Sequence, residues 1–142
     1  MKILLAVDGS KHAMRAVNCL IEHADWYRQK PQVELVTVHL PVPTVGSLAG
    51  GVNRSQVERY YREEGEACLA PAKKKLDAAK VRYAAHILVG PVAETLVKHA
   101  KKTRCDIIYV GNRSERTVAS VLFGSTATKV LALSPIPVLL VK

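Results

Sequence analysis

Short apolar runs alternate along this chain with longer segments in which apolar residues recur at helical spacing. The first run, residues 2–7, is nearly all apolar, which is typical of a strand whose two faces are both covered in a parallel sheet. The segment after it carries one apolar stripe and predicts an amphipathic helix with Ser10 as its N-cap. That stripe consists of Ala13, Ala16, Val17, Leu20, Ile21 and Ala24.

The same alternation continues to the end of the chain and predicts an α/β fold. Because strands and helices alternate throughout, we expect one domain over residues 1–142, in which a five-stranded parallel sheet carries helices on both faces in a Rossmann-like arrangement. Pro71 lies inside a predicted helix and removes a helical hydrogen bond, so we expect a kink or a restart near Ala70. The later strands are expected at 33–39, 82–89, 106–110 and 137–141, and the later helices at about 55–80, 93–100 and 116–133.

The composition favours a soluble cytoplasmic protein. Apolar residues make up 49% of the 142 residues, which is ordinary for a globular domain. No apolar run approaches the roughly 20 residues that span a bilayer. The apolar stretch at the start is only five residues long and ends in Asp8, so it does not resemble a signal peptide. We therefore expect a cytoplasmic location and no membrane partner.

The cysteines and histidines form no familiar disulfide or metal pattern. The chain has three cysteines, none of them in a CxxC pair, and its five histidines are scattered. We therefore expect idle thiols and no metal site. These residues are Cys19, Cys68 and Cys105, and His12, His23, His39, His86 and His99.

The charge of the chain favours anionic partners without choosing among them. A net charge of +9 attracts nucleotides, nucleic acid and acidic proteins alike, and a solvated basic face explains the lysine runs equally well. Nucleic acid is the weakest of these interpretations, because one Phe and one Trp provide no stacking platform and the chain has no recognition-helix or zinc pattern.

Two glycines near the predicted fourth strand mark a candidate ligand site. Gly111 directly follows that strand, and Gly124, with Ser125 and Thr126 after it, interrupts a segment that otherwise has a helical pattern. Glycine lets backbone N–H groups approach a phosphate closely, and hydroxyl groups add donors. The alternative is that Gly111 only turns the chain and Gly124 only permits close helix packing.

These residues also resemble the nucleotide motif of the universal stress protein family. That motif is Gly, two residues, Gly, nine residues, Gly-Ser/Thr, and the chain matches it from residue 111 to residue 125, with Ser114 in place of the second glycine. The resemblance extends in order over the whole chain apart from 41–80. It includes residues 3–10, His39-Leu40, Gly90-Pro91, residues 106–108, and 128–131 with 134–141.

The resemblance implies a strand order of 3-2-1-4-5 and a site for ATP with Mg²⁺ at the carboxyl ends of strands 1 and 4. Adenine is expected near the first-strand Asp and the residue after the second-strand His, with ribose and phosphates near the glycines. The site residues implied are Asp8, Leu40, Val110, Gly111, Asn112, Arg113, Ser114, Gly124, Ser125 and Thr126.

Ser114 is the one departure from the motif. If its position needs φ > 0, serine costs about 1 kcal/mol more than glycine, while Arg113 and Arg116 offer charges that can pair with phosphate. The function expected is therefore a stress-response module switched by ATP. The alternatives are a nucleotide-free interaction protein of the same family and a weak ATPase. A dedicated enzyme is not expected, because the sequence has no P-loop and no nucleophile–base grouping.

The family order also places strand 137–141 at a sheet edge. That strand is apolar, and an uncovered apolar edge is prone to pair with another chain. We therefore expect a homodimer through strand 5 with two-fold symmetry. The alternative is a monomer whose outer helices shield the edge.

Overall fold

Five parallel strands form the centre of the molecule. The computed structural model describes residues 1–42, 53–112 and 124–142, and in these ranges the strands form one sheet of order β3-β2-β1-β4-β5. The predicted α/β fold and strand order are therefore confirmed. The strands are β1 Lys2–Ala6, β2 Gln32–His39, β3 Tyr83–Val89, β4 Ile107–Gly111 and β5 Val138–Val141, and the helices are α1 Lys11–Glu22, η1 (a short 3₁₀ helix) Ala24–Trp26, α2 Arg54–Ala78, α3 Val92–Lys102 and α4 Ser125–Leu133.

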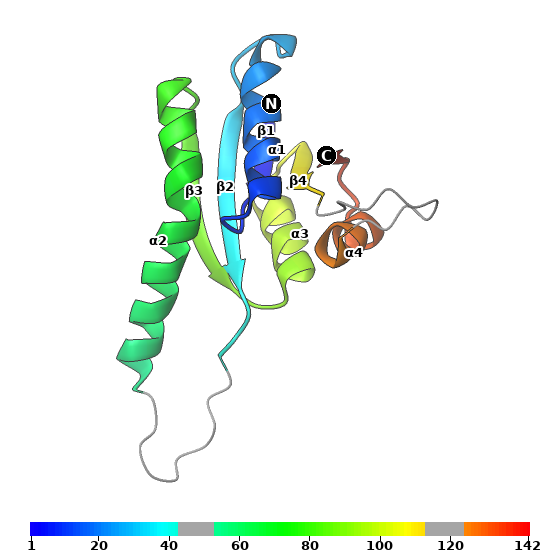
Figure 1. The fold of residues 1–142 in the computed structure, drawn as a ribbon. Coiled ribbons are helices and arrows are strands. Elements are labelled where there is room, and N and C mark those ends of the chain that lie inside the picture. The colour runs from blue at the N-terminus through cyan, green and yellow to red at the C-terminus, as the bar shows by residue number, and fades with distance from the viewer. Residues whose placement is uncertain (43–52, 113–123) are drawn as a thin grey trace.

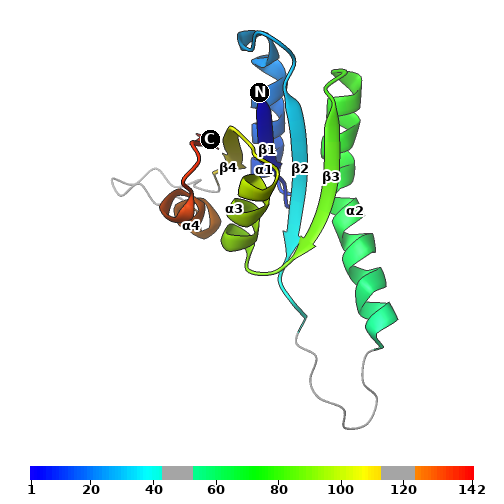
Figure 2. The same cartoon turned by 180° about the vertical axis from the view of Figure 1, so that it is seen from behind.

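Helices cover the sheet on both faces, α1 and α2 on one and α3 and α4 on the other (Figures 1 and 2). Alternate residues of β1 supply the two cores: Ile3 and Leu5 belong to the core under α1 and α2, and Leu4 to the core under α3 and α4. All three are 0% exposed. This two-sided burial explains why β1 is a continuous apolar run and not an alternating one.

The entry to α1 confirms the predicted N-cap. The Oγ of Ser10 accepts a hydrogen bond of 3.2 Å from the backbone N–H of Ala13, which satisfies one of the first-turn donors. The expected stripe packs inward, with Ala13, Ala16, Val17 and Leu20 all buried.

Helix α2 is continuous through Pro71, so the expected restart near Ala70 is wrong. Pro71 lies on the exposed side of the helix, where water can satisfy the backbone group that it leaves without a partner. Leu69 and Ala72 flank it and are buried, so packing holds the two halves in line. The last expected helix also differs, because α4 begins at Ser125; residues 116–123 of that prediction lie outside the described residues.

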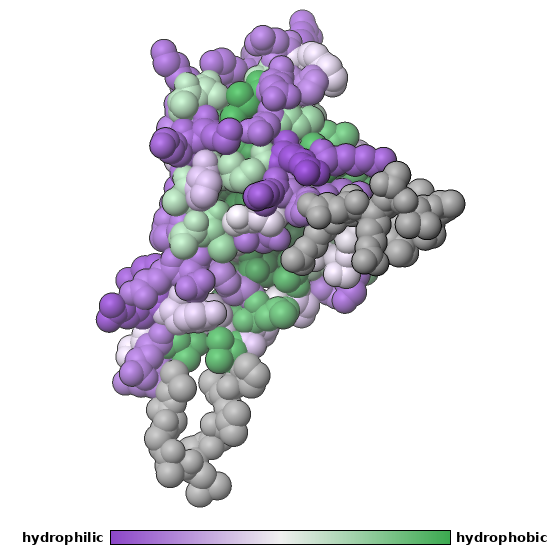
Figure 3. Space-filling model, in the orientation of Figure 1, coloured by the Kyte–Doolittle hydropathy of each residue, from purple (hydrophilic) through white to green (hydrophobic). Residues whose placement is uncertain are grey.

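Exposed apolar side chains lie at the carboxyl ends of β2 and β3. On the face seen in Figure 3, hydrophilic residues dominate the upper part, and hydrophobic ones show at the lower centre, beside the grey segment. The exposed apolar side chains at the ends of β2 and β3 include Leu40 and Val89. Among the described residues, no helix is both long and apolar enough to cross a membrane.

Candidate functional site

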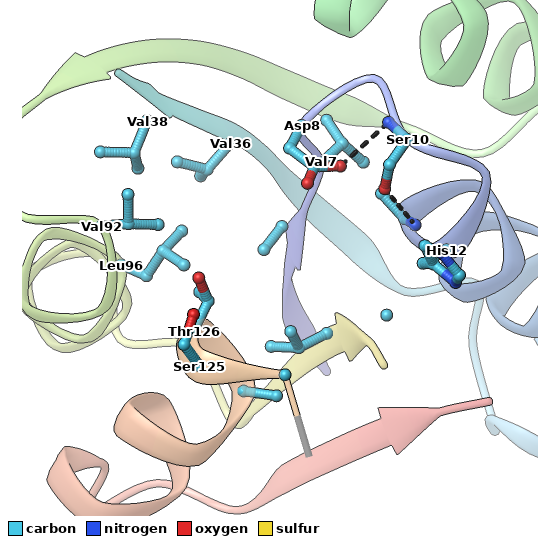
Figure 4. Close-up of a pocket in the computed structure, with 16 residues that line it drawn as sticks. Val7, Asp8, Ser10, His12, Val36, Val38, Val92, Leu96, Ser125 and Thr126 are labelled. Atoms are coloured by element: carbon cyan, nitrogen blue, oxygen red, sulfur yellow. Dashed lines mark hydrogen bonds between the residues drawn. The ribbon is translucent and has the colours of Figure 1, made fainter. Parts of the chain in front are cut away.

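A pocket of about 180 Å³ lies where the strand order reverses, at the carboxyl ends of β1 and β4 (Figure 4). Open parallel α/β sheets bind ligands at this place, because the crossovers on either side leave in opposite directions. Residues of β1, β2, β4, α1, α3 and α4 line it. The pocket therefore collects side chains that are far apart in the sequence.

One wall of the pocket is apolar. Val36 and Val38 of β2 lie on the same face of the strand, and Val92 and Leu96 of α3 lie close to them (Figure 4). Val36 is 0% exposed and Leu96 is 2% exposed, so these two form a fixed surface. Such a wall suits a flat, largely apolar group.

The opposite side of the pocket carries the turn between β1 and α1 (Figure 4). The Asp8 carboxylate accepts a hydrogen bond of 3.0 Å from the backbone N–H of Ser10. Gly9 between them has φ +78°, a left-handed conformation that favours glycine. The turn thus fixes an exposed carboxylate at the mouth of the pocket.

The amino end of α4 forms the third side. Gly124 is the N-cap residue, with φ −54° and ψ 148°, and within 1–42, 53–112 and 124–142 no side-chain hydrogen bond caps the helix there. Ser125 and Thr126 follow and line the pocket (Figure 4). First-turn N–H groups have no acceptor within their own helix, and the first turn of α4 holds no acidic residue. This side is suited to an anion, since the helix dipole adds to those N–H groups.

Gly111 brings α1 close to β4. A Cβ atom at this position would lie 2.2 Å from the main-chain oxygen of His12 and 2.8 Å from the nitrogen of Ala13. Only a residue without a side chain therefore permits the first turn of α1 to pack against the end of β4. Gly111 also lines the pocket, so it contributes both close packing and open space.

Asn112 connects β4 to the start of α4. Asn112 is only 2% exposed, and its Oδ1 accepts a hydrogen bond of 3.2 Å from the backbone N–H of Gly124. Its own N–H donates to the carbonyl of Val141 at 2.7 Å. Asn112 thus positions the amino end of α4 and does not itself line the pocket.

The pKa values of all three thiols are raised above that of a free cysteine, which disfavours the thiolate form. Burial raises the pKa of the Cys68 thiol beside the Asp8 turn; a hydrogen bond with Thr37 opposes this, and the Asp8 charge raises the pKa further. Burial likewise raises the pKa of Cys19 and of Cys105. All three are free cysteines.

The structure brings most of the predicted site residues together. Leu40 and Asn112 are the exceptions among the described ones: Leu40 is 66% exposed, Asn112 is buried at 2% exposed, and neither lines the pocket. Arg113 and Ser114 lie outside the described residues. The predicted residues that line the pocket are Asp8, Val110, Gly111, Gly124, Ser125 and Thr126.

The apolar wall was missed from the sequence. Val36 and Val38 alternate along β2 in a way that marks one face, but nothing in the sequence alone separates a pocket face from a core face. Leu96 belongs to an apolar helical stripe that predicts only a core face, and Val92 lies just before the expected helix. The expected strand order already placed the end of β2 beside the end of β1, but which side chains of β2 and α3 face the pocket depends on tertiary packing.

Comparison with known proteins gives one consistent family. The model of the universal stress protein family matches residues 1–142. The chain is 27% identical to the stress response protein NhaX of Bacillus subtilis, over 99% of this chain and 97% of that protein. It is 30% identical to the universal stress protein YxiE of the same organism, over 99% of this chain and 98% of that protein.

Solved structures of proteins similar to this chain agree with the family match. The hypothetical protein MJ0577 superposes with a TM-score of 0.75 at 25% identity, covering 99% of this chain and 94% of that one. A universal stress protein in complex with cAMP gives a TM-score of 0.66 at 24% identity, over 99% and 95% of the two chains. A universal stress protein family protein from Arabidopsis thaliana with AMP bound gives a TM-score of 0.71 at 16% identity, over 100% of this chain and 91% of that chain.

The contact at Gly111 predicts a specific cost. Gly111→Ala should lower the free energy of unfolding by about 1–3 kcal/mol, as overpacking does, and urea denaturation measures this. The cost should persist in a His12→Ala background, because the obstructing atom is a main-chain oxygen. A Gly111→Ala variant within about 0.5 kcal/mol of wild type would contradict the close contact.

Gly65 is the matched comparison, because there the obstructing atoms belong to the Ile87 side chain. Adding Ile87→Ala should therefore remove the stability cost that Gly65→Ala has on its own.

Proposed function

This chain belongs to the universal stress protein family, and we propose that it acts in the cytoplasm as a stress-response module whose pocket binds an adenine nucleotide, ATP with Mg²⁺ in particular. The observation that carries the proposal is the pairing, in one pocket, of an apolar wall with the amino end of α4, which no side chain of the described residues caps. A nucleotide has the same two halves, a flat base and an anionic phosphate chain.

The base fits the apolar wall. Val36, Val38 and Leu96 offer a surface against which a purine can stack. The Asp8 carboxylate lies across the pocket (Figure 4) and is an acceptor for the exocyclic amine of adenine. Leu40, exposed at the end of β2, is proposed as an apolar cover for the base. The relatives solved with cAMP and with AMP carry the same base.

The phosphates fit the amino end of α4. The N–H groups of its first turn and the hydroxyls of Ser125 and Thr126 are donors for phosphate oxygens. These hydroxyl oxygens are also hard donors of the kind that Mg²⁺ accepts, so the donor set fits a metal ion carried chiefly by the phosphates. When bound, Mg²⁺ neutralises part of the phosphate charge.

A nucleotide in this place would act as a switch through the elements it joins. The apolar wall belongs to β2 and α3, the carboxylate precedes α1, and the phosphate side is α4. Binding would therefore fix helices on both faces of the sheet relative to each other. Loss of the nucleotide would release that constraint and change the surface offered to a partner protein.

Ser125 offers a clean test, because it is exposed and lies at the first position of α4. Ser125→Glu places a negative charge where the phosphates are proposed to bind, while the same charge favours the helix dipole and leaves the fold stable. ATP with Mg²⁺ at ten times Kd should stabilise wild type by about 1.4 kcal/mol, which is a melting shift of about 4 °C. Ser125→Glu should abolish this shift, and the uncharged control Ser125→Gln should keep it.

Adenosine separates the two halves of the site, because it has no phosphate. Its smaller stabilisation should be equal in the Glu and Gln variants. If ATP raised the melting temperature equally in the two variants, the phosphates would not bind at the amino end of α4. No shift of wild type with ATP, AMP or cAMP would instead favour the nucleotide-free interaction module.

We also propose that two copies pair through β5. This strand lies at the sheet edge beside β4, and its four residues are apolar and only partly buried. Amides of β4 and the residue after it donate to the carbonyls of Pro137 and Val141, so the peptide groups of Val138 and Leu140 face away from β4. They lie on the side of β5 where no strand of the described residues pairs with it, and we propose that a second copy pairs there.

Light scattering tests the pairing at micromolar concentration. Wild type should have twice the mass of one chain, and Leu140→Pro should be monomeric because it loses an outward N–H group. Leu140→Val keeps that group and should stay dimeric. Wild type that is already monomeric would refute the pairing.

A further inference from the structure

A second cluster of potential metal-ligating side chains lies between the sheet and helix α3, away from the pocket lining. Glu34 of β2, His86 of β3 and His99 of α3 point toward one another. The Oε2 of Glu34 lies 2.6 Å from Nε2 of His86 and 3.3 Å from Nε2 of His99. One atom from each of the three residues thus falls within 4.8 Å of the others.

The carboxylate of this cluster is buried, which is unusual for glutamate. Glu34 is 6% exposed, and its other oxygen, Oε1, lies 2.8 Å from Nζ of Lys2. The two oxygens therefore have different partners: Oε1 forms an ion pair with Lys2, and Oε2 contacts the two histidines. A carboxylate fixed in this way by an outer partner is oriented as metal-binding carboxylates are.

We propose that Glu34, His86 and His99 form a site for a divalent transition-metal ion of the zinc class. Two imidazole nitrogens and one carboxylate oxygen are the donor set that zinc takes in open sites, with a fourth position left for water or another ligand. Imidazole with carboxylate also disfavours Mg²⁺ and Ca²⁺, which prefer oxygen donors alone.

The two separations that involve the Glu34 carboxylate are close to those that such an ion requires. Zinc ligands at about 2.0–2.1 Å in a tetrahedron lie roughly 3.3 Å from one another. The separation between His99 and Glu34 already has this value, and that between His86 and Glu34 must open by roughly 0.7 Å from 2.6 Å. His86 lies on an edge strand and its side chain is 31% exposed, so it can move.

The site is accessible and distinct from the nucleotide pocket. Ala84, two residues before His86 on the same face of β3, is exposed, so the sheet edge leaves an approach to the cluster. None of the three ligands lines the pocket. The expectation of no metal site rested on sequence spacing, which cannot detect this cluster because the two histidines lie 52 and 65 residues from Glu34 along the chain.

Calorimetry with Zn²⁺ on chelator-treated full-length protein tests the proposal. Wild type should bind one equivalent, and Glu34→Gln should weaken binding at least tenfold, since changes even to outer partners cost ten- to a hundredfold. His86→Gln should do the same, and because His86 is partly exposed this variant should fold like wild type. His23→Gln is the matched control; it removes the histidine beside Cys19 and should bind as wild type does.

Co²⁺ identifies the ligands independently. Bound cobalt should show visible bands without thiolate charge-transfer absorption, because no cysteine belongs to the cluster. Wild type that binds no zinc would overturn the proposal. So would equal affinity in wild type and both cluster variants, or a thiolate band, each of which would place the ion elsewhere.

Discussion

All five strands of the sheet run in the same direction, and this constraint determines where chemistry can occur. Two adjacent parallel strands need a crossover connection between them, which here is a helix. The carboxyl ends of the strands and the amino ends of the helices that follow them therefore lie at the same edge of the sheet. The partial positive ends of α1 and α4 consequently meet at the pocket. Gly111 permits this meeting, because any side chain there would collide with the main chain of α1.

Much of the fold could be predicted from the sequence, because both faces of a parallel sheet are buried and leave clear apolar runs. The stripe on α1 and its Ser10 cap are local signals, and both are confirmed. Pro71 was misread as a restart because local propensity ignores packing: the buried neighbours Leu69 and Ala72 hold α2 together. Strand order required the family resemblance, since no local pattern encodes it.

The candidate site was predictable where it depends on motifs and not where it depends on tertiary contacts. Gly124, Ser125 and Thr126 carry a sequence pattern, and they line the pocket. The valines of β2 carry none that separates them from core residues. The cluster of Glu34 with its two histidines was even harder to predict from the sequence, since its residues come from three different elements. The wall of the pocket and this cluster share β2 and α3, so packing between these two elements supports both.

Hydrogen exchange at the first turn of α4 tests the central claim most directly. The amides of Ser125, Thr126 and Ala127 have no acceptor within their own helix, so they should exchange quickly in the nucleotide-free protein. Saturating ATP with Mg²⁺ should slow these amides selectively, while those at the middle of α2 stay unchanged. Unchanged exchange at residues 125–127 under saturation, or protection confined to another surface, would contradict a phosphate site at the amino end of α4.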